Sequence, residues 1–103
     1  MLKFNEKNYE LKYNLKRIEM IEASTSMPTM AQIKQTGGYF GVGDLKTYIT
    51  YGLKEEGADV FIMPAKAQEL ADEMIMEVGY TRLCSEVLAA LEKDCPFFFQ
   101  GAW

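Results

Sequence analysis

The chain has 103 residues, of which 49% are hydrophobic, and this is enough for the core of one domain of ordinary size. It carries 15 Asp and Glu against 11 Lys and Arg, a formal charge of −4, and so lacks the excess positive charge that neutralises nucleic-acid phosphates. No segment approaches the run of about 20 apolar residues that crosses a membrane. We therefore expect one domain over residues 1–96, with neither nucleic acid nor membrane as a partner.

The first segment has the pattern of a β-hairpin. Leu2 and Phe4 alternate with polar residues before a polar turn, and Tyr9, Leu11 and Tyr13 alternate with polar residues after it. An isolated hairpin is barely stable in water, so its apolar face must be covered either by the rest of the domain or by another subunit. Tyr9, Leu11 and Tyr13 are therefore the candidate residues for self-association.

After the hairpin, the apolar residues recur three or four positions apart, which is the period of a helix. Asn14, Asp44 and Thr81 are suitable N-caps, and Gly57 and Gly79 suit helix C-termini. The predicted fold is α+β and predominantly α, an N-terminal hairpin followed by four or five short helices. The expected boundaries are residues 2–13 for the hairpin and about 14–25, 28–36, 44–56, 64–78 and 81–95 for the helices.

Glycines in two places carry further expectations about the helical part. Gly52 falls on the apolar stripe of the 44–56 helix, which indicates either the close approach of another helix or a glycine tolerated by chance. The segment 39–43 contains two glycines and is predicted to be a flexible connection between helices.

The two cysteines, Cys84 and Cys95, both fall within or at the end of the last predicted helix. They are eleven positions apart, which in a helix is roughly 16 Å and beyond the reach of a disulfide. We therefore expect two buried free thiols and a reducing compartment, the cytoplasm.

The sequence lacks the residue combinations that usually perform catalysis. It has no His, the commonest general base and metal ligand. The glycines of residues 37–43 lack the preceding strand and the Lys-Ser/Thr pair of a phosphate-binding loop. The acidic pairs at 55–56 and 72–73 lack the ligand spacing of a calcium loop. We therefore predict no enzymatic activity, no catalytic or metal-binding residues and no cofactor.

Residues 97–103 form an apolar tail after a proline that ends the last helix. Phe97, Phe98, Phe99 and Trp103 are candidate partner-binding residues, because exposed aromatic side chains commonly mark protein interfaces. Three adjacent Phe side chains cannot all point the same way, so at least one should remain exposed even where the tail folds back onto the core. The hairpin and the tail together carry more apolar surface than so small a domain buries alone, so we expect a homo-oligomer.

Residues 11–25, Leu-Lys-Tyr-Asn-Leu-Lys-Arg-Ile-Glu-Met-Ile-Glu-Ala-Ser-Thr, resemble the small tail assembly chaperones of long-tailed bacteriophages and related prophages. In that family a short hairpin ends in an aromatic residue, and a helix then carries an apolar-Glu pattern into a polar turn. A middle helix at 45–57, a helix at 64–79 ending in Glu-Val-Gly-Tyr, and a closing helix through Leu91 extend the resemblance over most of the chain.

The resemblance implies a protein that binds the tape measure protein and keeps it soluble until tail tube subunits polymerise around it. Such a protein acts in the cytoplasm of the bacterial host and is absent from the mature virion. In the family, a longer form made by frameshifting binds the tail tube protein, and this chain would be the short form. Phe is encoded only by TTT and TTC, so residues 97–99 require a T-rich run on which paired tRNAs can slip.

Two other functions remain open at this stage. The first is a small structural virion protein, such as a head-tail connector or a tail terminator. The second is a small regulatory module that binds one other protein.

Overall fold

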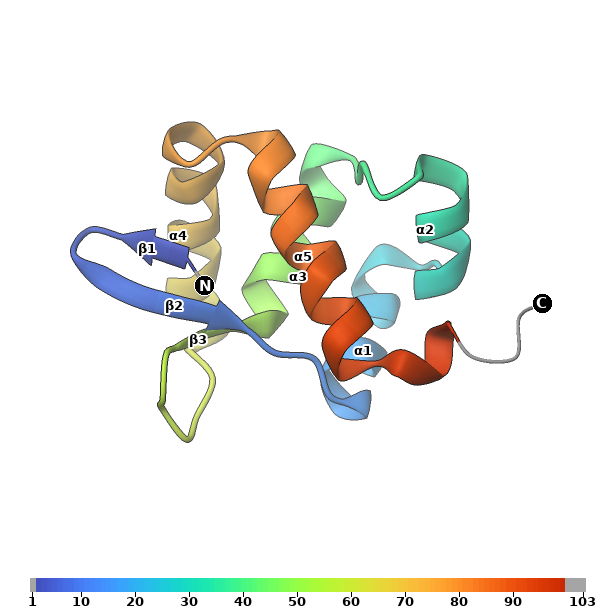
Figure 1. Cartoon of the computed structure of the whole chain (residues 1–103), viewed down its shortest axis with the longest axis horizontal. Helices are drawn as coiled ribbons and strands as arrows, with labels where there is room; N and C mark the ends of the chain where they lie inside the picture. The colour runs from blue at the N-terminus through green and yellow to red at the C-terminus, as the bar shows by residue number, and fades with distance from the viewer. Residues whose placement is uncertain (1, 100–103) are drawn as a thin grey trace.

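The computed structural model describes residues 2–99, and the fold is α+β and predominantly helical, as the sequence predicts (Figure 1). The sheet lies at one end of the long axis, α2 lies at the other end, and α5 crosses between them. None of the helices in residues 2–99 combines the length and the apolarity needed to cross a bilayer. The elements, in chain order, are β1 (Leu2–Phe4), β2 (Lys7–Leu11), α1 (Leu15–Thr25), α2 (Thr29–Thr36), α3 (Val42–Gly52), β3 (Leu53–Glu55), α4 (Pro64–Glu77), α5 (Tyr80–Asp94) and the short 3-10 helix η1 (Pro96–Phe98).

The sheet is antiparallel, with β2 in the middle of the order β1-β2-β3. Leu11 of β2 lies opposite Leu53 of β3, and both side chains are buried in the core. Glu10 lies opposite Lys54, and because side chains alternate along a strand, this pair occupies the other face. Their charged groups lie 3.8 Å apart. One face of the sheet is thus apolar and covered, and the other is polar.

The helix predicted over residues 44–56 is wrong at its C-terminal end. α3 ends at Gly52, and the chain continues directly into β3, which pairs with β2. Gly57 lies beyond the strand with a φ of 80°, so it shapes a turn and does not end a helix. The periodicity of the sequence does not reveal β3, because the hydrogen-bonding partner of that strand comes from the distant N-terminal hairpin.

Of the first two predicted N-caps, one is confirmed and one is displaced. Asn14 caps α1, since its Oδ1 accepts a hydrogen bond of 2.8 Å from the backbone N–H of Arg17. α3 begins at Val42 after Gly41, so Asp44 lies in the first turn of the helix and not at its N-cap. There its negative charge still faces the positive end of the helix dipole.

The boundary between α4 and α5 is close to the prediction. Gly79 has a φ of 107° and follows the end of α4, as expected for a helix stop. α5 begins at Tyr80, so Thr81 is inside the helix and is not its N-cap. The helix ends at Asp94, and Pro96 opens the 3-10 helix instead of extending α5.

The centre of the core is built around Tyr48 of α3, which is fully buried. Its ring packs on that of Phe40 with 4.8 Å between centroids, and its O–H donates a hydrogen bond of 2.9 Å to Oε1 of Gln32. Phe40 is itself 0% exposed, so the prediction of a flexible connection over residues 39–43 is wrong at this residue. The buried ring of Phe40 anchors this connection. The nearby glycines made the segment look flexible in the sequence.

The close approach predicted at Gly52 is real, but the neighbour is not a helix. A Cβ atom added at Gly52 would lie 2.6 Å from Cε1 of Tyr13, a residue of the segment that joins β2 to α1. The glycine is therefore required by an aromatic ring that lies against the C-terminal end of α3.

Candidate protein-binding site

Residues 58–63, here called the 58–63 loop, form the part of the β3–α4 connection that leads into α4, and their backbone is held by hydrogen bonds at both ends. The N–H of Ala58 donates to the carbonyl of Glu55 at 3.0 Å, and the N–H of Ile62 donates to the carbonyl of Leu53 at 3.1 Å. These bonds tie the loop to the edge strand β3. The loop therefore presents its side chains from a defined backbone shape.

Two large apolar side chains of this loop face solvent. Val60 is 73% exposed and Met63 is 74% exposed, whereas Phe61 and Ile62 are half-buried. They surround a hollow of about 300 Å³ lined by Glu55, Ala58, Val60, Phe61, Ile62, Met63 and Lys66. Apolar side chains held outward around a concavity are a common feature of protein-binding surfaces.

Arg17 of α1 contacts the ring of Phe61. The central carbon of its guanidinium lies 3.9 Å from the centroid of the ring, a cation–π contact. Burial lowers the pKa of Arg17, and its Nη1 is buried without a hydrogen-bond partner among the described residues. The ring thus supplies part of the favourable environment that the cation loses by leaving water, and the contact joins the loop to α1.

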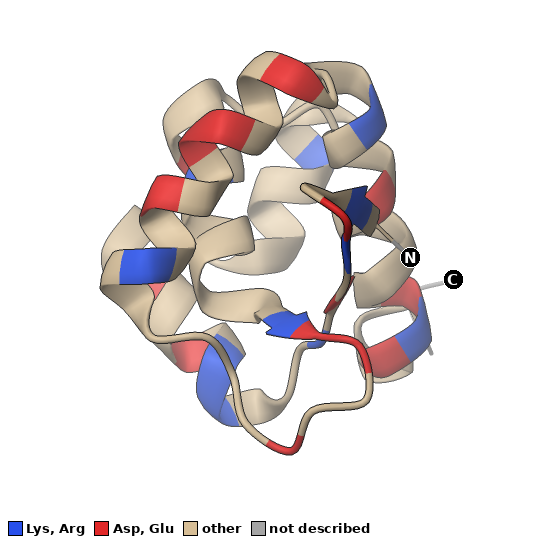
Figure 2. Cartoon of the chain, turned by 90° about the vertical axis from the view of Figure 1, so that its left-hand side faces the viewer, with Lys and Arg blue, Asp and Glu red and all other residues tan. Residues whose placement is uncertain are grey.

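The helix that follows the loop has an acidic outer face. Glu69, Glu73 and Glu77 lie four residues apart, so they project from one side of α4, and all three are exposed. No ion pair joins them to a lysine or arginine of residues 2–99, whereas Asp72 pairs with Lys46 of α3 at 2.8 Å. Figure 2 shows acidic segments along α4 and along the turn after β3 in the same view. The apolar hollow, which Lys66 also lines, therefore lies in predominantly acidic surroundings.

The hairpin residues proposed for self-association lie in the core. Tyr9 is 5%, Leu11 8% and Tyr13 3% exposed, and all three belong to the buried cluster shared with the helices. The prediction that they form a self-association face is therefore wrong. The apolar face of the hairpin is covered by helices of the same chain, which is the first of the two alternatives that the sequence leaves open.

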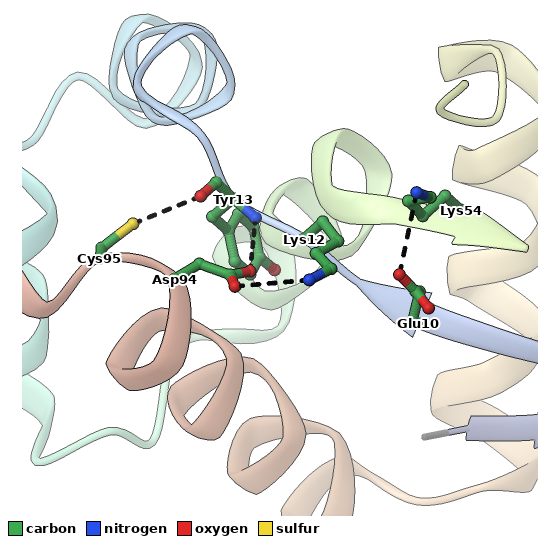
Figure 3. A network of polar contacts seen from close by, with 6 residues as sticks. All are labelled: Glu10, Lys12, Tyr13, Lys54, Asp94 and Cys95. Carbon is green, nitrogen blue, oxygen red and sulfur yellow. Dashed lines mark hydrogen bonds and ion pairs between the residues drawn. The ribbon is translucent and has the colours of Figure 1, made fainter. Parts of the chain in front are cut away.

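Tyr13 also joins three elements through hydrogen bonds, and Figure 3 shows those with Asp94 and Cys95. Its N–H donates to Oδ2 of Asp94 at 3.0 Å, and its O–H donates to the carbonyl of Tyr48 at 2.9 Å. Cys95 Sγ donates to the carbonyl of Tyr13 at 3.6 Å, and Lys12 lies 3.8 Å from Asp94. Burial raises the pKa of Tyr13 well above its usual value, so the hydroxyl remains a donor. This network is structural, since it ties the end of β2 to α3 and to the end of α5.

The aromatic tail is partly folded against the domain. Phe97 is 47% exposed, Phe98 is half-buried and packs on the core, and Phe99 is half-buried. The ring centroids of Phe97 and Phe98 are 4.6 Å apart, and those of Phe98 and Phe99 are 6.5 Å apart. Phe97 is thus available to a partner, as expected for at least one of the three, and Trp103 lies outside the described residues.

Both cysteines are free and buried, as the sequence predicts. Burial raises the pKa of the Cys95 thiol, and the nearby charge of Asp94 acts in the same direction, so the reactive thiolate is disfavoured. Within residues 2–99, no three acidic or cysteine side chains gather closely enough to hold a metal ion.

The sequence identifies the 58–63 loop only as a short apolar run before a proline. Its four consecutive apolar residues have neither the period of a strand nor that of a helix. This lack of a period is the feature of the sequence that indicates an unusual surface. Comparison of the chain with protein-family models, curated proteins and solved structures finds no match. The role of the loop must therefore be inferred from its own geometry.

Proposed function

We propose that this chain is a non-enzymatic protein that binds another polypeptide through the 58–63 loop and serves as a bacteriophage tail assembly chaperone. The supporting observation is the exposure of Val60 and Met63, at 73% and 74%, on a loop whose backbone is held by hydrogen bonds. Each Å² of apolar surface removed from water contributes about 25 cal/mol, so a polypeptide that covers these side chains is bound favourably. Because the loop is already ordered, little conformational entropy is lost on binding.

The identity of the partner comes from the resemblance of residues 11–25 and the later helices to tail assembly chaperones. On this proposal the client is the tape measure protein, whose long helical chain is kept soluble until tail tube subunits enclose it. The protein acts in the host cytoplasm and leaves before the virion is complete. A longer frameshifted form would bind the tail tube protein, and any homo-oligomer would use exposed residues such as Phe97 instead of the buried hairpin face.

Co-expression with the tape measure protein of the same phage tests the proposal. We expect the chain to raise the soluble fraction of the tape measure protein, and the double variant Val60→Ser/Met63→Ser to lose most of this effect. The matched control is Tyr39→Ser/Val42→Ser, which removes two other exposed apolar side chains, at 60% and 59% exposure, from a different part of the surface. A tape measure protein that is equally soluble with and without the chain would refute the chaperone function.

The composition of purified virions separates the chaperone from a structural component. A chaperone leaves the assembly, so we expect at most trace amounts of the chain in mature particles by mass spectrometry. Abundant copies would instead indicate a connector or terminator.

A further inference from the structure

The 58–63 loop and the outer side of α4 adjoin, because Lys66 of α4 lines the hollow together with the loop residues, and the two are treated together as one surface. Met63 is the N-cap residue of α4, so the loop leads into the helix without a connecting segment. Near the far end of α4, Met76 is 84% exposed. The thirteen residue steps from Met63 to Met76 span about 20 Å along the helix, which is between three and four turns. An apolar side chain is therefore exposed near each end of this surface.

The charge along this surface is predominantly negative. α4 contains one lysine, Lys66, against four acidic residues, and Glu69, Glu73 and Glu77 form a ridge of like charges four residues apart. Like charges at this spacing repel one another and weaken the helix slightly. A cation placed between them relieves that repulsion.

The other side of the hollow is acidic as well. Glu55, the last residue of β3, lines it, and the exposed residues Glu56 and Asp59 follow in the segment between β3 and α4. A partner with acidic residues would bring like charges together on both sides of the apolar contact, and such juxtaposition is strongly unfavourable. A partner with basic residues beside its apolar ones would be attracted on both sides.

The neighbouring backbone favours a helical partner over an extended one. An extended peptide binds by adding a strand to a free sheet edge. At β3 this edge is occupied, because the N–H of Ile62 already donates to the carbonyl of Leu53 at 3.1 Å. A hollow next to the side of a helix instead suits the apolar stripe of a second helix.

We infer that the segment bound by this protein is a basic amphipathic helix, which places apolar residues on the 58–63 loop and basic residues along Glu69, Glu73 and Glu77. The inference rests on the proposed function and specifies the chemistry of its partner.

The probe is a pair of synthetic 18-residue amphipathic peptides with the same leucine pattern, one with lysine and one with glutamate at every polar position. Each is titrated into the isotope-labelled full chain and followed by amide chemical shifts. We expect the lysine peptide to bind at least about tenfold more tightly than the glutamate peptide, and the advantage to shrink with added salt. The shifted amides should cluster in residues 55–77.

A charge-removing variant and its matched control test the ridge. Glu69→Gln/Glu73→Gln/Glu77→Gln should weaken binding of the lysine peptide about tenfold, since each exposed charge contributes a factor of about two. This variant should be at least as stable as the parent, because it removes like-charge repulsion within α4. The control removes the same number of charges from exposed positions elsewhere, Glu6→Gln, Glu19→Gln and Glu92→Gln, and should leave the affinity within about twofold.

Three results would overturn the inference: equal binding of the two peptides, equal weakening by the two triple variants, or shifts outside residues 55–77. If neither peptide binds, the inference is overturned as well. If the solubility of the tape measure protein still depends on Val60 and Met63 in that case, the proposed function survives without the basic helix. If lysine-peptide binding is found but the tape measure protein is unaffected, the surface is real and the chaperone function fails.

Discussion

Replacing Gly52 by alanine tests the packing that joins the N-terminal segment to α3. The added Cβ would lie 2.6 Å from Cε1, 2.7 Å from Cζ and 2.9 Å from the hydroxyl oxygen of Tyr13, all well inside van der Waals contact. The ring has little freedom to withdraw, because Tyr13 is 3% exposed and its O–H is bonded to the carbonyl of Tyr48. Either the ring or the end of α3 must therefore move.

Overpacking of this kind costs about 1–3 kcal/mol of the free energy of unfolding. Alanine is favoured over glycine inside a helix by up to about 1 kcal/mol, but Gly52 is the last residue of α3 and gains less than an interior position. We expect a net loss of about 2 kcal/mol, equivalent to a fall in melting temperature of about 8–16 °C for a domain of this size.

Urea denaturation followed by circular dichroism gives the measurement. The control is Gly43→Ala in the same helix, where an added Cβ meets nothing within 4 Å, and this variant should be slightly more stable than the parent. A double-mutant cycle with Tyr13→Leu should show strong coupling, because the smaller side chain removes the clash. If Gly52→Ala is as stable as the parent, or if the two substitutions are additive, the contact does not constrain the fold.

Three further results are expected from the polar contacts of the core. Tyr48→Phe leaves Oε1 of the buried Gln32 without its donor and should lower the free energy of unfolding by about 1–3 kcal/mol, as measured by urea denaturation. The surface control Tyr39→Phe should lower it by less than about 0.5 kcal/mol. Equal losses would contradict this role of the hydrogen bond. Asp94→Ala removes the acceptor of the Tyr13 N–H, so it should be less stable than Asp94→Asn by about 1 kcal/mol, and equal stabilities would show that the bond is unimportant. Above pH 10 the unfolded chain loses the Tyr13 proton while the folded chain keeps it, so the free energy of unfolding should fall as the pH rises. Tyr13→Phe should reduce the slope of that fall, and an unchanged slope would assign it to other groups.

Elements whose stabilising interactions are local can be predicted from the sequence. The α+β class, the alternation of the hairpin, the five helices of residues 2–99 and the cap at Asn14 follow from side-chain periodicity and from contacts between near neighbours. The free buried thiols could be predicted for the same reason, since helix geometry separates Cys84 from Cys95.

Features that depend on residues far apart in the chain become visible only in the folded structure. Leu53 belongs to a strand because β2 pairs with it, and Tyr13 is buried because α3 and the end of α5 surround it. Apolar character in the sequence does not distinguish a side chain that finds such neighbours from one that does not. Tyr9 and Val60 are both apolar in the sequence pattern, yet Tyr9 is 5% exposed and Val60 is 73% exposed. The reason is that only Tyr9 lies on the sheet face that the helices cover.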